Sequence, residues 1–221
     1  MDVSKIFDAL NDPQREAVGA PPGPMLVLAG AGSGKTRVLT YRIAYLVQAL
    51  EVSPYSILAV TFTNKAANEM RKRIEGFLGF SVRGMWIGTF HGLSHRILRD
   101  HHELAGLPKG FEILDSDDQY RVIRRALKEL NLDEGYWPPR QIQWFINSQK
   151  EEGRRAAQVQ DNGDSHQQTL IRVYSHYEET CQRLGLVDFA ELLLRTLELL
   201  EQTPSLLENY QQRFQHILVD E

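Results

Sequence analysis

One stretch of the chain has the residue types and spacing of a phosphate-binding loop, Ala29-Gly30-Ala31-Gly32-Ser33-Gly34-Lys35-Thr36. Its glycines let the backbone wrap an anion with N–H groups, including conformations with positive φ. Lys35 would neutralise the β- and γ-phosphates of a nucleotide, and the Thr36 hydroxyl would ligate Mg²⁺. The stretch therefore predicts a site for a nucleoside triphosphate, either ATP or GTP.

The segments on either side of this loop have the patterns that such a site requires. Residues 24–29 form an apolar run typical of a strand buried on both faces. Residues 36–50 contain no proline or glycine, and their apolar side chains recur at helical spacing. This order favours a nucleotide loop over a glycine-rich turn with a solvated lysine. One departure is Ala29, which stands where the strict pattern has glycine.

A second candidate group lies at the end of the sequence. Three apolar β-formers, residues 217–219, precede the carboxylates Asp220 and Glu221. Alone, such a pair is typical of a solvated strand end. Together with the phosphate loop, it predicts a strand of the same parallel sheet, with Asp220 holding Mg²⁺ directly or through water. Glu221 would then orient and deprotonate the attacking water.

Composition and charge limit the class of protein. The 221 residues are 42% hydrophobic and 24% charged, which is typical of a soluble globular protein of one large or two small domains. The N-terminus lacks signal-peptide features and no apolar run approaches membrane-spanning length, so we expect a cytoplasmic protein without a membrane partner. A single cysteine, Cys181, fits a reducing compartment. The net charge of −4 means that any nucleic-acid binding must come from a local patch.

The order of elements predicts an α/β fold interrupted by a long helical segment. Further buried strands are expected at residues 57–63 and 85–89, each followed by a helix. From about 116 to 208 the pattern is helical, with capping boxes at 116–119 and 188–191 and no convincing strand. We therefore predict a parallel sheet with helices on both faces and a helical insertion before its last strand.

Taken in order, these motifs resemble the UvrD/Rep/PcrA branch of superfamily 1 helicases, and the resemblance runs essentially from Met1 to Glu221. Besides the phosphate loop, it rests on residues 10–18 (LNDPQREAV), 59–67 (AVTFTNKAA), 88–92 (GTFHG), 186–189 (LVDF) and 217–221 (ILVDE). Alanine at the first loop position is normal in that family. The resemblance implies an incomplete P-loop RecA-like subdomain, 1A, formed by residues 1–91 and 214–221. Residues 92–213 would be the all-helical accessory subdomain, 1B.

The resemblance also implies roles in nucleotide binding. Gln14 lies in what resembles the family's Q motif, where a carboxamide accepts from the adenine amino group and donates to N7. By itself Gln14 is typical of a capped helix, and Arg37, which touches phosphates in such enzymes, is typical of a solvated helix face. The expected catalytic residues are Lys35, Asp220 and Glu221. The residues expected to bind ATP and Mg²⁺ are Gln14, Ala29, Gly30, Ala31, Gly32, Ser33, Gly34, Lys35, Thr36, Arg37 and Asp220.

Two further blocks resemble the family's contacts to single-stranded DNA. The first lies at the C-terminal end of the strand at 57–63, and the second follows the strand at 85–89; ligand loops of a parallel sheet lie at this edge. A phenylalanine stacks on a base of any sequence, and hydroxyl and amide groups bind phosphates. The residues expected to contact DNA are Phe62, Thr63, Asn64, Lys65, Thr89, Phe90 and His91.

Other side chains have two interpretations. His91 and His95 have the spacing of a metal-binding helix pair, but Gly92 replaces the glutamate of a metalloprotease and no third ligand is evident. Four aromatic residues would face DNA or pack in a helical core, and core packing is favoured for most of them. They are Tyr136, Trp137, Trp144 and Phe145.

The family resemblance implies an ATP-dependent 3′–5′ helicase that acts on single-stranded DNA and junctions in mismatch and nucleotide-excision repair, with repair proteins as partners. Because the family's other motifs would follow Glu221, we expect a monomeric fragment that binds nucleotide weakly and unwinds nothing; self-association of the longer protein is left open. Alternatives are a Rep-like or recombination helicase motor, another P-loop NTPase, and a non-enzymatic module that binds DNA or protein.

Overall fold

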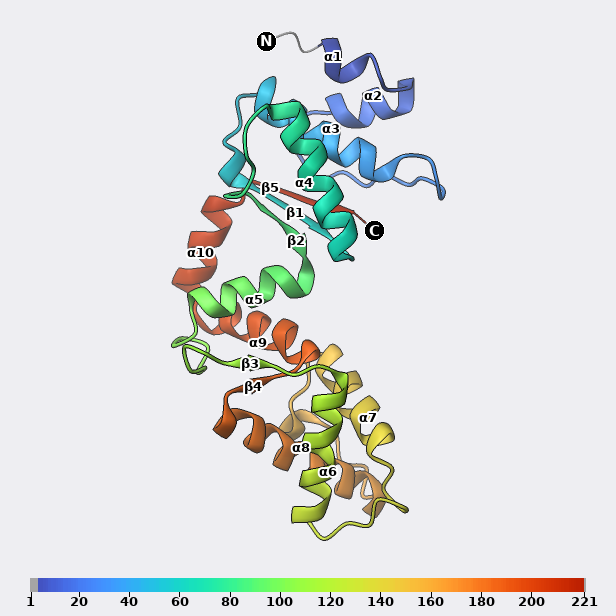
Figure 1. Cartoon of the computed structure of the whole chain (residues 1–221), viewed down its shortest axis with the longest axis vertical. Coiled ribbons are helices and arrows are strands. Elements are labelled where there is room, and N and C mark those ends of the chain that lie inside the picture. Colours follow the sequence, from blue (N-terminus) through green and yellow to red (C-terminus); the bar gives the residue numbers. More distant parts are fainter. Residues whose placement is uncertain (1–3, 221) are drawn as a thin grey trace. The chain divides into compact units, whose positions relative to one another are not determined.

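The computed structural model describes residues 4–220 and divides the chain into two compact units. Unit 1 comprises the residues up to 93 and from 204, and unit 2 comprises residues 94–203 (Figure 1). The helices of unit 1 are α1 (Ser4–Phe7), α2 (Asp12–Gly19), α3 (Lys35–Gln48), α4 (Asn64–Leu78) and α10 (Pro204–Arg213). Its strands are β1 (Ile57–Thr61), β2 (Trp86–Thr89) and β5 (His216–Asp220). Helix α5 (Phe90–Asp100) crosses the boundary at residue 93.

The sheet of unit 1 is parallel, with the order β2-β1-β5. Within it, Thr61 at the end of β1 is in register with Thr89 of β2 on one side and with Asp220 of β5 on the other. The carboxyl ends of all three strands therefore meet in one row. Residues that follow this row lie at the edge where parallel sheets bind their ligands.

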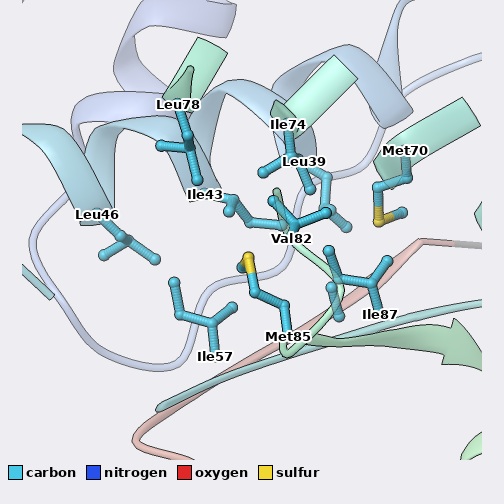
Figure 2. Close-up of a cluster of buried hydrophobic side chains, with 11 residues drawn as sticks. Leu39, Ile43, Leu46, Ile57, Met70, Ile74, Leu78, Val82, Met85 and Ile87 are labelled. Atoms are coloured by element: carbon cyan, nitrogen blue, oxygen red, sulfur yellow. The ribbon is translucent and has the colours of Figure 1, made fainter. Parts of the chain in front are cut away.

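Helices cover both faces of this sheet, as predicted. On one face, apolar side chains of α3 and α4 meet those of β1 and β2, with Ile43, Met70 and Ile74 fully buried (Figure 2). Side chains alternate along a strand, so Trp86 points to the face opposite Ile87. There its indole lies edge-on to the rings of Tyr210 and Phe214 at 5.7 and 5.1 Å between centroids. These two rings belong to α10 and the residue that follows it.

The strand predicted at residues 24–29 is wrong. The segment is not assigned to any strand, and Leu26 and Leu28 are 82% and 85% exposed. The apolar pattern predicted burial on both faces, but a strand forms only where a neighbour supplies backbone hydrogen-bond partners. Among the described residues the segment pairs with no strand, and β5 at the edge of the sheet exposes Ile217 and Val219 by 63% and 51%.

The division between the units differs from the predicted boundaries of 91/92 and 213/214. The compact units separate at 93/94 and 203/204, so α10 belongs to the sheet unit and not to the helical segment. Helical periodicity shows which face of α10 is buried but not which core receives it. Its packing on Trp86 decides the assignment. That unit 1 corresponds to subdomain 1A and unit 2 to subdomain 1B remains a proposal.

Unit 2 consists mainly of helices around its own core. They are α6 (Ser116–Glu129), α7 (Pro139–Glu151), α8 (Ser165–Leu184) and α9 (Phe189–Gln202). The prediction that this segment is all-helical is wrong in one detail, because β3 (Glu112–Ile113) and β4 (Leu186–Val187) form a short parallel pair. Strands of two residues are too short for an alternating pattern to be read from sequence. Within the described residues, no helix combines the length and apolarity needed to cross a membrane.

Local signals fix the ends of these helices. Gly185 ends α8 in the left-handed conformation with φ of 67°, and the Asp188 carboxylate begins α9 by accepting from the Glu191 backbone N–H. At α6 the cap lies one residue before the capping box predicted at 116–119. The cap of α6 is the Asp115 carboxylate, which accepts from the N–H groups of Asp117 and Asp118 at 2.8 Å.

Candidate nucleotide site and strand-end surface

The phosphate loop owes its shape to two of its glycines. Gly32 and Gly34 have φ of 74° and 91°, a region that disfavours other residues, whereas Gly30 has no positive φ. A Cβ at Gly34 would lie 3.0 Å from Gln14 Nε2, so this position is also restricted in space. Gly34 directly precedes α3 and has no side chain to cap it. The first N–H groups of α3 are consequently available to an anion.

The Lys35 side chain folds back on the phosphate loop. Its Nζ donates to the backbone carbonyls of Ala29 at 2.9 Å and Gly30 at 3.1 Å. The Ser33 hydroxyl also donates to the Gly30 carbonyl, at 2.7 Å. These bonds close the loop on itself and hold a positive charge at its centre. Phosphate oxygens would offer that ammonium charged acceptors in place of neutral carbonyls.

Thr36 and Asp220 meet although 184 residues separate them. The Thr36 hydroxyl donates to Asp220 Oδ2 at 2.8 Å, which joins the start of α3 to the end of β5. A hydroxyl and a carboxylate are oxygen ligands of the kind that Mg²⁺ prefers. The pair therefore fits a magnesium–nucleotide site, and magnesium binding by Thr36 and Asp220 remains a prediction. Glu221, the predicted base, lies outside the described residues.

Gln14 contacts the phosphate loop directly. Its Nε2 donates to the Ser33 carbonyl at 3.0 Å, while its Oε1 accepts from the Asn11 backbone N–H at 3.2 Å. Asn11 returns a bond, because its Oδ1 accepts from the Gln14 N–H at 3.0 Å. The sequence reasoning missed Asn11, although Asn followed three residues later by Gln is a capping signature. The adenine contact of Gln14 remains a prediction.

Arg37 lies against the N-terminal helices and not over the loop. Its Nη2 donates to the Ala9 carbonyl at 2.7 Å, and its guanidinium lies 5.4 Å from the centre of the Tyr41 ring. These contacts hold the connection between α1 and α2 against α3. A phosphate contact of Arg37 remains a prediction.

The two predicted DNA-contacting blocks lie side by side at the strand ends. Phe62 and Phe90 follow the paired residues Thr61 and Thr89, and strands in a sheet lie about 4.8 Å apart. Phe62 is 76% exposed and Phe90 is 39% exposed. The two exposed rings therefore follow neighbouring strands at one edge of the sheet.

The polar residues of these blocks divide into exposed groups and groups that hold the backbone. Asn64 and Lys65 are exposed, and His91 is half-buried. The Thr63 hydroxyl caps α4 by accepting from the Ala66 N–H at 3.1 Å. The Thr89 hydroxyl is buried and accepts from the Gly92 N–H at 3.1 Å. Both threonines therefore shape the strand ends.

The remaining candidates are also placed. Among the described residues, no group of three or more His, Cys, Asp or Glu side chains could hold a metal, and His95 lies edge-on to Phe111. Burial, with a smaller effect of Arg99, lowers the pKa of His95. Core packing is correct for Trp137, at 8% exposed. Tyr136 and Trp144, at 71% and 72% exposed, do not pack in the core. For Trp144 the reason is that helical spacing did not reveal which face of α7 meets the core.

The sequence pattern of the UvrD/REP helicase N-terminal domain matches residues 10–221. The chain belongs to this family. DNA helicase II of Salmonella typhimurium and that of Escherichia coli are 61% and 60% identical to it over the whole chain. The ATP-dependent DNA helicase PcrA of Leuconostoc citreum is 45% identical, also over the whole chain.

The chain spans 31% of the length of the two helicase II relatives and 30% of the PcrA relative. The parallel sheet and its helices agree with membership of the UvrD/REP family, and the sequence-based recognition of that family is confirmed.

Proposed function

We propose that the chain is the ATP-binding part of an ATP-dependent DNA helicase that moves 3′ to 5′ on single-stranded DNA. The observation that carries this proposal is the 2.8 Å hydrogen bond from Thr36 to Asp220, which brings the phosphate loop and the last strand into one site. The names of the relatives, DNA helicase II and ATP-dependent DNA helicase PcrA, support the assignment.

The residues divide the work of ATP hydrolysis by position. The N–H groups of the loop and of the start of α3 would bind the β- and γ-phosphates, and Lys35 would turn from the Ala29 carbonyl toward them. Thr36 and Asp220 would hold Mg²⁺, which neutralises charge on the β- and γ-phosphates when bound. Glu221 follows Asp220 and would accept a proton from the attacking water.

DNA would lie at the carboxyl edge of the sheet. Phe62 and Phe90 offer exposed rings for base stacking, and Lys65 follows on the first turn of α4 for a phosphate contact. Because Thr61 is in register with both Thr89 and Asp220, the same row of strand ends serves the stacking residues and the metal site. A displacement of the strand ends at the metal site would therefore also displace the stacking residues.

The biological setting is also a proposal. We infer a cytosolic protein that acts on single-stranded DNA and single-strand–duplex junctions in mismatch and nucleotide-excision repair, together with repair proteins. The 60–61% identity to the helicase II relatives supports this setting, and a Rep-like or recombination motor remains the alternative. The sheet unit would serve as subdomain 1A and the helical unit as subdomain 1B.

Steady-state ATP hydrolysis with and without single-stranded DNA tests the proposal. We would compare the chain, a longer form that extends past residue 221 to the length of the relatives, and Lys35→Ala in each. We expect DNA-stimulated turnover in the longer form and its loss in the Lys35 variant. Unstimulated turnover in the longer form would favour a different P-loop NTPase. DNA binding that nucleotide does not alter, without turnover, would favour a binding module.

A further inference from the structure

Unit 2 has an aromatic pocket that none of the roles above uses. It has a volume of about 490 Å³ and lies at the start of α7, where the segment before that helix meets the first turns of α8. Its walls are formed mainly by Tyr136, Trp137, Pro138, Trp144, Phe145 and His166.

The floor of the pocket is held in place by ring contacts. Trp137 is buried, and its ring stacks on His166 with 4.6 Å between centroids. The Trp137 backbone N–H donates to the Asp133 carbonyl at 2.9 Å, which fixes the turn that carries the ring. Phe145 lies edge-on to the buried ring of Tyr174. The floor therefore needs little rearrangement to receive a ligand, which lowers the entropic cost of binding.

The rim of the pocket presents two large side chains to solvent. Trp144 is 72% exposed and Tyr136 is 71% exposed, whereas Ile142 and Ile146 on the other face of α7 are buried in the core. Exposed aromatic side chains around a hollow are typical of binding sites. Each also carries a polar hydrogen, and within the described residues neither the indole N–H of Trp144 nor the hydroxyl of Tyr136 donates a hydrogen bond.

Exposed carboxylates lie on the segments next to the pocket, and the cation in its lining is already engaged. The cation in its lining, Arg140, already donates to Asp117 Oδ1 and Gln143 Oε1 at 3.0 Å and lies over the Tyr120 ring. Three exposed carboxylates lie on the segments that lead into Tyr136 and His166, and no ion pair to them is found among the described residues. They are Asp133, Asp161 and Asp164.

We propose that this pocket binds a proline-containing, basic segment of a partner protein. Proline-rich segments are preformed extended helices that pack on aromatic faces, and their free carbonyls accept from indole N–H and phenol O–H groups. Asp161 accepts from the Gly163 N–H and Gln168 Nε2, and Asp164 accepts from the His166 N–H, so both keep their negative charge without a cation in the described part of the chain. Lysine or arginine beside the prolines would supply that cation. A nucleic acid fits less well, because its phosphates would face those carboxylates without an uncommitted cation. This site is independent of the proposed helicase function.

Fluorescence anisotropy of a labelled peptide tests the proposal. The probe has six prolines flanked by two arginines at each end, and we would titrate it with the intact chain. Two matched peptides serve as controls, one with glycine and serine in place of the prolines and one with glutamate in place of the arginines. Trp144→Ala and Tyr136→Ala remove the rim, while Phe80→Ala removes an exposed aromatic ring of unit 1. A ten-residue oligothymidylate serves as a competitor.

We expect saturable binding of the proline–arginine probe and at least about tenfold weaker binding of both control peptides. Trp144→Ala and Tyr136→Ala should each weaken binding of the probe by about tenfold, and Phe80→Ala should leave its binding unchanged. Circular dichroism would confirm that both exposed-site variants remain folded. The proposal is overturned by absence of saturable binding, by equal binding to the Trp144 variant, or by oligothymidylate that displaces the probe in a Trp144-dependent way.

Discussion

At the residue scale, the contact between Thr36 and Asp220 makes magnesium dependence a direct test of the nucleotide site. With Asp220→Asn we expect the preference for nucleotide with Mg²⁺ over nucleotide in EDTA to fall to near one, because an amide is a poor ligand for this cation. Binding of a fluorescent ATP analogue with and without Mg²⁺ measures that ratio. Asp133→Asn, an exposed carboxylate of unit 2, is the control. An unchanged ratio in the Asp220 variant would contradict the assignment.

Two glycines of the phosphate loop, Gly30 and Gly34, provide a matched pair of substitutions at the same scale. Gly34→Ala should lower the free energy of unfolding by about 1–2 kcal/mol and weaken nucleotide binding, because its φ is 91° and the Cβ would crowd Gln14 Nε2. Gly30→Ala meets open space at ordinary φ and should change the free energy of unfolding little. Urea titration of both variants makes the comparison. Equal losses would show that the loop is not held in this conformation.

Phe62 permits a third residue-scale prediction. Because its ring is 76% exposed, Phe62→Ala should leave the fold intact. It should weaken the binding of single-stranded DNA by about 1–3 kcal/mol, which is the contribution of one stacked base. Anisotropy of a labelled oligothymidylate at fixed salt measures the change. Phe80→Ala removes a ring that is 48% exposed at the other end of α4 and should have no effect. If both variants bind alike, the DNA does not lie on the strand ends.

At the element scale, a buried ionic cluster joins helices α7 and α9 of unit 2. Lys150 of α7 donates to Asp188 at 2.7 Å and lies 2.9 Å from Glu191 of α9, and Arg155 donates to Glu191 at 2.7 Å. Burial alone would raise the pKa of Glu191, but Lys150 and Arg155 outweigh it and hold that pKa well below its ordinary value of 4.5. Removal of any one member of such a cluster is strongly destabilising, because it leaves a buried charge without its partner.

This cluster predicts how stability responds to acid. Because the folded pKa of Glu191 is lowered, the unfolded chain binds more protons below about pH 4.5, and the stabilisation is lost as the pH falls. Wild type should lose up to about 1.4 kcal/mol per pH unit more than Glu191→Gln in this range. Urea titrations at pH 5, 4 and 3 measure both slopes, with exposed Glu201→Gln as control. Parallel slopes for wild type and Glu191→Gln would refute the linkage.

These elements also show what a sequence can and cannot predict. The phosphate loop and helices α3, α4, α8 and α9 follow from local patterns, because glycine φ, caps and helical periodicity act over a few residues. Residues 24–29 show the opposite case, since an apolar run does not create a strand partner. The ionic cluster and the aromatic pocket depend on residues far apart along the chain, such as Lys150 with Asp188, and no local pattern reports that contact.

At the scale of the whole molecule, each unit contains its own core. The core of unit 2 gathers side chains from residue 114 to residue 181, and all members of the ionic cluster also lie between 94 and 203. The chain enters this unit within α5 and leaves it between α9 and α10. A continuous stretch with a closed core and satisfied buried charges has what a domain needs to fold by itself.

We therefore expect a polypeptide of residues 94–203 to unfold in one cooperative thermal transition when followed by circular dichroism at 222 nm. Lys150→Ala should abolish that transition, because two buried carboxylates would lose their shared cation at a cost of about 3–5 kcal/mol. Lys128→Ala, on the exposed face of α6, should keep the transition and change the free energy of unfolding by no more than about 0.5 kcal/mol. A gradual loss of helix in the unsubstituted polypeptide would mean that unit 2 depends on the sheet unit for its stability, and that the buried ion pairs alone do not close its core.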